Sequence, residues 1–109
     1  MVPNLPIEGK EMSIQVSNNT AVIAKIIGIH ISWPEPPNGN LDKVKFDGNE
    51  IYGFDDPPEA WIDSSTDPTY LPGFTSHTLT FFFPNDVAPT GYWIELWFSV
   101  SGCSTSGGA

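Results

Sequence analysis

The nonapeptide Tyr92-Trp93-Ile94-Glu95-Leu96-Trp97-Phe98-Ser99-Val100 decides the fold class of this chain. In an extended strand its side chains would form two sets, with Tyr92, Ile94, Leu96, Phe98 and Val100 on one face and Trp93, Glu95, Trp97 and Ser99 on the other. Alternation over this length, rich in aromatic and β-branched types, is a strong β-strand signal. The second face should be polar, yet it carries two tryptophans. These outward indoles are the first candidates for a functional surface.

The composition limits the class of protein. With 109 residues, the chain is long enough for one domain with a single core. Eleven prolines and ten glycines are typical of short strands and tight turns, and 13% aromatic residues argue against disorder. The formal net charge is −9, and all four cationic residues are lysines. Because phosphate backbones and anionic membranes attract clustered basic side chains, this charge balance argues against nucleic acid and membrane surfaces as partners.

Six stretches of the sequence predict strands. They are residues 12–16, 21–33, 44–46, 50–52, 78–83 and 92–100, separated by turn signals such as Asn18-Asn19, Leu71-Pro72-Gly73 and Pro84-Asn85. Residues 61–62 add a seventh, either as a short edge strand or as a plug that a long loop inserts into the core. No stretch predicts a helix, because the isoleucine-rich segment 21–33 contains a glycine and many β-branched residues.

The segment 21–33 is predicted to contain a β-bulge. Downstream, Ile27, Ile29, Ile31 and Trp33 share one face, with Gly28, His30 and Ser32 opposite. Upstream, Val22, Ala24 and Ile26 alternate in the other phase. A change of phase inside one strand needs an extra residue, so we expect a bulge or bend near Ile26-Ile27-Gly28.

The dipeptide Asp47-Gly48 predicts a β-hairpin. It stands between Val44–Phe46, which alternates with exposed lysines, and the run Glu50–Tyr52. Both residues of a type I′ turn need a positive φ, and Asp-Gly supplies it at low cost.

Together these elements predict an all-β fold, an immunoglobulin-like two-sheet antiparallel β-sandwich of six to seven strands. The sandwich would span residues 11–103. Residues 1–10 are expected to form an extended N-terminal segment, as a donor strand or a linker, and residues 104–109 a flexible tail. The sequence has no signal peptide and no apolar run of about 18 residues that could span a membrane. We therefore expect a mature or excised segment of a secreted protein.

The end of the chain raises a question of topology. An immunoglobulin-like sandwich usually ends with a hairpin of its last two strands, but residues 101–109 are too small and polar to predict another apolar strand. Either the N-terminal segment fills the vacant place, or the sheet has an open edge. Open edges are templates for pairing with another chain, as in donor-strand complementation.

A resemblance to known modules starts at Leu71-Pro72-Gly73-Phe74-Thr75-Ser76-His77-Thr78-Leu79-Thr80-Phe81-Phe82-Phe83 and continues through Gly91-Tyr92 and the last strand. Together with the Asn18-Asn19 turn, this segment resembles the immunoglobulin-like or fibronectin-like β-sandwich modules of secreted bacterial surface proteins. The resemblance covers roughly residues 11–103. It implies a spacer, an adhesive unit or a subunit of an appendage at the cell surface, and it brings no catalytic residues.

The sequence predicts no enzyme. His30 is expected on the outer face of its strand and His77 at the start of another, and neither lies in a catalytic motif. The serines form no nucleophile elbow, and no His/Cys cluster has zinc spacing. Cys103 is expected to be a free thiol, with an intermolecular disulfide as the alternative.

Calcium is the one metal with candidate ligands. Their oxygens cluster in two loops, at Asn38, Asn40 and Asp42 and at Asp55, Asp56 and Asp63. We prefer the interpretation that these residues are solvated turn residues without bound calcium, because Asp and Asn are also the usual residues of turns. No cofactor is therefore predicted.

The outward aromatic side chains are a stronger indication of function than the calcium candidates. If the last strand pairs with residues 78–83, Phe82 lies on the same outward face as Trp93 and Trp97, which are about 13 Å apart along the strand. Such a patch can contact another protein, stack against a polysaccharide, or be covered by the loop 53–73 with Trp61, Phe54 and Tyr70.

These observations lead to one expectation and one alternative. We expect a non-enzymatic extracellular structural or assembly module of a prokaryotic surface protein or filament, a pilus-like subunit or adhesin domain. It would interact through Phe82, Trp93, Trp97 and Trp61 and through an open sheet edge, with self-association or neighbouring domains as partners. The alternative is a carbohydrate-binding module with an exposed tryptophan platform for polysaccharide.

Overall fold

The computed structural model describes residues 7–34, 38–53, 59–64, 69–88 and 91–106. These residues form ten β-strands and no helix, and so include no helix long and apolar enough to cross a membrane. The strands are β1 (Ile7–Glu8), β2 (Glu11–Asn18), β3 (Ala24–Ser32), β4 (Lys43–Phe46), β5 (Asn49–Tyr52), β6 (Ala60–Asp63), β7 (Tyr70–Leu71), β8 (Ser76–Phe82), β9 (Trp93–Phe98) and β10 (Cys103–Ser106).

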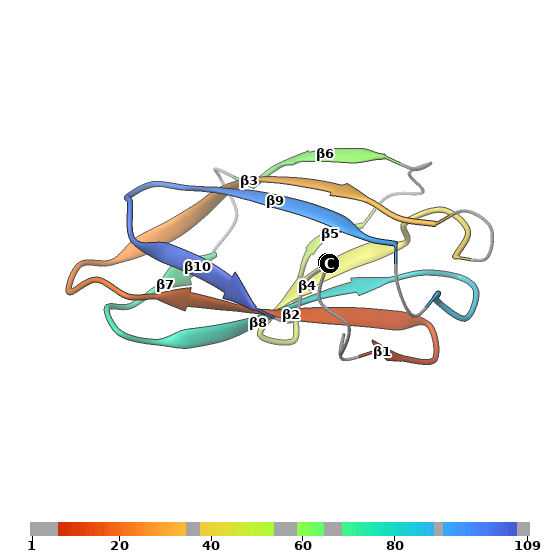
Figure 1. The fold of residues 1–109 in the computed structure, drawn as a ribbon, viewed down its shortest axis with the longest axis horizontal. Helices are drawn as coiled ribbons and strands as arrows, with labels where there is room; N and C mark the ends of the chain where they lie inside the picture. Colours follow the sequence, from red (N-terminus) through yellow and green to blue (C-terminus); the bar gives the residue numbers. More distant parts are fainter. Residues whose placement is uncertain (1–6, 35–37, 54–58, 65–68, 89–90, 107–109) are drawn as a thin grey trace.

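The strands form two antiparallel sheets that lie one above the other (Figure 1). The six-stranded sheet has the order β1-β2-β8-β4-β5, and β10 also pairs with β2. In the four-stranded sheet β3 is central: β6 and β7 pair with separate parts of it, and β9 pairs with it too. Because β6 and β9 pair with the same residues of β3, they lie on opposite sides of it. The prediction of an all-β protein with two antiparallel sheets is confirmed.

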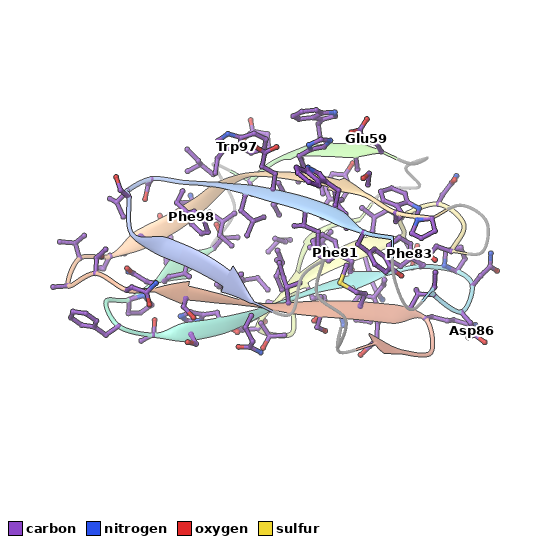
Figure 2. All side chains as sticks on the ribbon, in the orientation of Figure 1. Glu59, Phe81, Phe83, Asp86, Trp97 and Phe98 are labelled. Atoms are coloured by element: carbon purple, nitrogen blue, oxygen red, sulfur yellow. The ribbon has the colours of Figure 1, made fainter. Side chains whose placement is uncertain are left out.

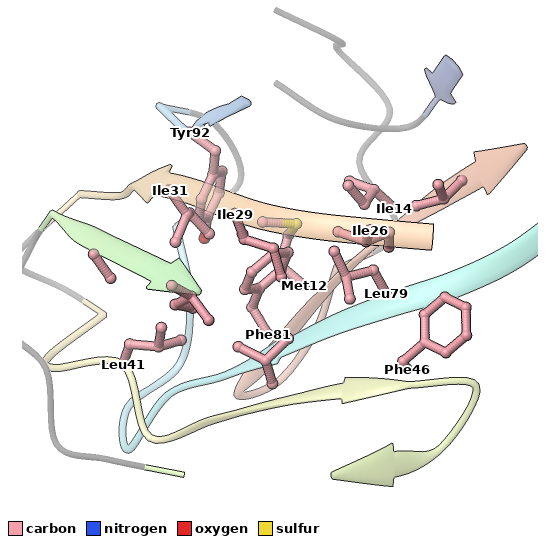
Figure 3. Packing of buried hydrophobic residues seen from close by; sticks show 14 of the residues in the cluster. Met12, Ile14, Ile26, Ile29, Ile31, Leu41, Phe46, Leu79, Phe81 and Tyr92 are labelled. Carbon is pink, nitrogen blue, oxygen red and sulfur yellow. The ribbon is translucent and has the colours of Figure 1, made fainter. Parts of the chain in front are cut away.

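Alternating apolar residues of both sheets meet in one core (Figure 3). Met12 and Ile14 of β2 and Phe81 of β8 are fully buried and lie opposite Ile29 and Ile31 of β3. In Figure 2, Phe81 and Phe83 point into the space between the layers, and so does Phe98 from β9. Burying a side chain of this size contributes about 1.5–3 kcal/mol, so this layer is the main source of stability.

The predicted bulge in β3 is present. The pairing of β3 with β9 shifts register between Ile26 and Gly28. Ala24 and Ile26 before the shift, and Ile29 and Ile31 after it, all point into the core. Two expected positions differ. Ile27, predicted to face inward, is 38% exposed, because it is the extra residue of the bulge. Val22, predicted to share a face with Ala24 and Ile26, is 56% exposed and lies before β3, which begins at Ala24.

The predicted Asp47-Gly48 hairpin is confirmed. β4 and β5 pair directly across it, and both turn residues have positive φ, 49° at Asp47 and 84° at Gly48. Trp61-Ile62 forms the edge strand β6. Ile62 points into the core and Trp61 points out.

The strand count and the tail differ from the expectation. The described residues form ten strands rather than six or seven, because β1, β7 and β10 pair through their backbones and have little side-chain pattern. Residues 104–106, expected to belong to a flexible tail, form β10 together with Cys103 on the edge of β2. Pairing at an open edge needs only backbone N–H and C=O groups, so an apolar pattern is not required. Residues 107–109 of the predicted tail lie outside the described residues.

Candidate binding surface

The outer face of the four-stranded sheet carries three tryptophans, Trp61 from β6 and Trp93 and Trp97 from β9. The register places them around β3: Trp61 is opposite His30, Trp97 is opposite Gly28, and Trp93 is opposite Ser32. Their exposed fractions are 65% for Trp61, 60% for Trp93 and 40% for Trp97. We call this surface the aromatic face. It faces away from the core, and Trp97 lies on it in Figure 2.

His30 supports Trp61 from below. The two rings are nearly parallel, with centroids 3.6 Å apart and 8° between their planes. The stack leaves His30 only 7% exposed, although its strand position faces outward as predicted. Its Nε2 contacts the Glu59 carboxylate, and its Nδ1 is 3.6 Å from Oε1 of Glu95, too far for a hydrogen bond. His30 of β3 thus contacts β6 through the Trp61 ring and contacts Glu59, the residue just before β6.

Gly28 makes room for Trp97. A Cβ built on Gly28 would lie 3.1 Å from Cε3 of Trp97, closer than most Cβ contacts. The indole therefore occupies the space that a side chain would take at this position. Trp97 and Trp61 lie side by side there, with ring centroids 5.9 Å apart and 27° between their planes.

A shallow groove of about 430 Å³ lies beside these two indoles. Trp61 and Trp97 both line it, together with Gly28 and Asp63. Asp63, together with Glu59 and Glu95, makes the surroundings of the aromatic face acidic. The surface offers apolar ring faces beside carboxylates, which suits a ligand with an apolar body and cationic or hydroxyl groups.

The expected cover of the tryptophans is not seen among the described residues of the loop 53–73. Tyr70 lies instead beside Lys25, whose Nζ is 4.9 Å from the ring centroid. Trp61 is part of the exposed surface, and Phe54 lies outside the described residues. The described residues of this loop therefore leave the three tryptophans exposed.

Phe82 is not on the aromatic face, so this prediction was wrong. It rested on pairing between the last strand and residues 78–83, but β9 pairs with β3 and β8 belongs to the other sheet. Phe82 lies on the outer face of the six-stranded sheet. The Nζ atoms of Lys43 and Lys45 approach its ring, 5.1 and 5.3 Å from the centroid. We call this group of three residues the lysine face.

The edge of the four-stranded sheet at β9 is open in the described part of the chain. There β9 pairs with β3 alone, so alternate backbone groups of β9 have no strand partner on the other side. Leu96 and Phe98 point inward from β9 but are only partly buried. The described part of the N-terminal segment does not fill this place, because β1 pairs with β2. Residues 1–6 of the expected donor segment lie outside the described residues.

The second histidine belongs to the hairpin. His77 Nδ1 contacts Asp47 Oδ2, and Asp47 Oδ1 accepts the Thr78 N–H at 2.9 Å. Burial alone would raise the pKa of Asp47, but the hydrogen bonds from His77 and Thr78 and the charge of His77 outweigh it and hold this pKa below its ordinary 3.8. The Asp47–His77 pair fixes the turn and belongs to neither the aromatic face nor the lysine face.

The calcium candidates do not form one group. Asn38 is fully buried: its Nδ2 donates to the Tyr92 hydroxyl, and its Oδ1 accepts the Ala88 N–H. Asn40 and Asp42 belong to the segment before β4, whereas Asp63 lies on β6 of the other sheet. Asp55 and Asp56 lie outside the described residues. Among the residues that are described, no three His, Cys, Asp or Glu side chains are placed to hold a metal ion.

Cys103 is a free, partly buried thiol at the start of β10, packed against the core. Burial raises its pKa above the ordinary value, so the reactive thiolate is a minor form. Burial likewise raises the pKa of Tyr92, against the opposing effect of the hydrogen bond from Asn38. Both groups are therefore neutral near pH 7.

Two features were missed from the sequence. One is the support of Trp61 by His30 and Glu59, which depends on β6 lying beside β3. The other is an exposed apolar group at Val22, Ile23 and Phe74, with Phe74 in a left-handed conformation (φ 57°). The Leu-Pro-Gly-Phe turn was the only sequence signal for the second feature.

Comparisons with protein-family models, with curated proteins and with solved structures found no match to this chain.

Proposed function

We propose that this chain is a non-enzymatic, extracellular β-sandwich module that assembles with other protein units, as part of a prokaryotic surface protein or filament. The observation that carries the proposal is the aromatic face, where Trp61, Trp93 and Trp97 are all at least 40% exposed. Tryptophans are enriched at the centres of protein interfaces, where they bury a large area. Holding three of them in water is costly unless a partner covers them.

An immunoglobulin-like topology is part of this proposal. In that fold, strands B and E pair in one sheet and strands C and F in the other. β2 with β8 and β3 with β9 would take these places. The place of strand G, beside β9, has no occupant among the described residues. A strand from another chain fits such a place by backbone pairing.

The test is the dependence of self-association on Trp97. Sedimentation velocity of the wild-type chain should show association that increases with protein concentration, and Trp97→Ala should weaken it. Phe74→Ala is the matched control, because Phe74 is 73% exposed but lies in the turn before β8. Association that is unchanged in Trp97→Ala, or equally weakened in Phe74→Ala, would count against the proposal.

Carbohydrate binding is the second candidate, favoured by the groove that Trp61 and Trp97 line. The indole rings could stack on sugar rings, and the Asp63 carboxylate in the lining could accept hydrogen bonds from hydroxyl groups. In this case polysaccharide should quench tryptophan fluorescence, and Trp61→Ala should reduce the quenching. A flat titration with cellulose, chitin and xylan would remove this candidate.

A further inference from the structure

The two outer faces of the sandwich differ in charge. On the lysine face, the ammonium groups of Lys43 and Lys45 converge on the Phe82 ring. Among the described residues, neither lysine forms an ion pair with a carboxylate. The same sheet also carries Glu11 opposite Phe82 and Glu50 opposite Lys45. The positive charge is therefore confined to the β4 side of Phe82.

The aromatic face has the opposite character. Asp63 and Glu95 occupy outward positions beside Trp97 and Trp61, and Glu59 lies against His30. One lysine of this sheet, Lys25, is held at its far end against Tyr70. One side of the sandwich thus offers indole rings and carboxylates. The other side offers two ammonium groups around a phenyl ring, with Glu50 and Glu11 on the strands that flank them.

We propose that the aromatic face of one copy binds the lysine face of a second copy, sheet against sheet. This inference rests on the proposed assembly function and names its partner surface. Ammonium groups are attracted to tryptophan ring faces and to carboxylates, and the attraction grows as water is excluded. Phe82 packs against the groove that Trp61 and Trp97 line, and Lys43 and Lys45 approach Asp63 and Glu95.

The positions of the two faces fix the kind of assembly. They belong to different sheets and lie on opposite sides of the sandwich, as the two layers in Figure 1 show. A contact between two different surfaces is heterologous, so each copy can bind one neighbour on each side. Repetition of this contact gives an open chain of subunits. A contact of two aromatic faces would instead stop at a dimer.

The test uses two variants that each block one face. Trp61→Ala/Trp97→Ala removes the ring faces, and Lys43→Glu/Lys45→Glu reverses the positive charge. Analytical ultracentrifugation should show large, concentration-dependent species for the wild type and monomers for each variant alone. An equimolar mixture should give a one-to-one dimer and nothing larger, because only one intact aromatic face and one intact lysine face remain to pair.

Each other outcome has a definite meaning. If Lys43→Glu/Lys45→Glu associates like the wild type, the lysine face is not used and the inference is overturned, while the proposed assembly function stands. If Trp61→Ala/Trp97→Ala still associates alone, pairing at the β9 edge or between two lysine faces is indicated, and the inference is overturned. If both variants are monomeric and their mixture stays monomeric although the wild type associates, the two faces do not pair with each other, and the inference is again overturned. If the wild type itself is monomeric, the proposed function fails as well.

A second pair of variants tests whether a loss of association is caused by misfolding. Asp63→Lys/Glu95→Lys blocks the aromatic face by charge and leaves all tryptophans in place. It should be monomeric alone and should associate with Lys43→Glu/Lys45→Glu, because the exchanged charges restore the attraction. Unchanged far-UV circular dichroism and unfolding midpoints of these two charge variants show that their substitutions leave the fold intact. Failure of this charge-exchanged pair to associate would contradict the proposed pairing.

Discussion

Phe81 and Phe82 are consecutive residues of β8 that serve opposite sides of one sheet: Phe81 is fully buried in the core, and Phe82 is half-buried on the outer face, where Lys43 and Lys45 approach its ring. Phe81→Ala should lower the free energy of unfolding by about 3–5 kcal/mol, because it leaves a cavity in the core. Phe82→Ala should lower it by less than about 1 kcal/mol and should weaken self-association. Urea unfolding and sedimentation of the two variants separate these effects. A large stability loss with Phe82→Ala would mean that Phe82 is a structural residue.

The same pair shows what the sequence could predict. Period-two alternation assigned Phe81 to the core and Phe82 to the outside, and it likewise assigned the two faces of β9. The bulge near Gly28 and the Asp47-Gly48 turn were predicted from local chemistry, because each depends on a few adjacent residues.

The order of strands could not be predicted in this way. The sequence alone placed Phe82 beside Trp93 and Trp97, because nothing in a single strand says which strand lies beside it. The structure pairs β9 with β3, and this brings Trp61 and His30 to Trp97 instead. β10 was missed because its pairing with β2 uses backbone groups, which leave no side-chain pattern.

The stack of His30 on Trp61 should stabilise the fold and orient the aromatic face. His30→Ala removes a ring that is largely buried, so the free energy of unfolding should fall by about 1–3 kcal/mol. The near-UV circular dichroism of the tryptophans should weaken, because Trp61 loses the ring that fixes it. Unchanged stability and an unchanged near-UV spectrum would contradict the supporting role of His30.

His30→Phe is the matched variant for this prediction. It keeps an aromatic ring below Trp61 but removes the contact with Glu59. It should therefore retain most of the near-UV signal that His30→Ala loses. Equal losses in both variants would show that the polar contact with Glu59, rather than the stack, holds Trp61 in place.

The Asp47 carboxylate should stabilise the hairpin in a pH-dependent way. Because its pKa is lower in the folded chain than the ordinary 3.8, its ionised form stabilises the fold above that pH. This contribution is lost as the pH falls through the folded-state pKa. Asp47→Asn, which tolerates the positive φ of this position, should be less stable than the wild type at neutral pH.

In strong acid, the wild type and Asp47→Asn should have nearly equal stability, because the wild-type carboxyl is then protonated. Thermal unfolding midpoints measured above and well below pH 3.8 test this convergence. A constant difference between the two proteins at every pH would show that the turn geometry, and not the charge of Asp47, accounts for the effect.

The central claim is that the aromatic face joins this chain to another protein unit, in the first place to a second copy. The most direct measurement is the weight-average molar mass of the wild type and of Trp61→Ala/Trp97→Ala in sedimentation equilibrium over a range of protein concentrations. We predict a mass that rises with concentration for the wild type and stays at the monomer value of 11.9 kDa for the variant. A wild type that stays monomeric, or a variant whose mass rises equally, would contradict the claim.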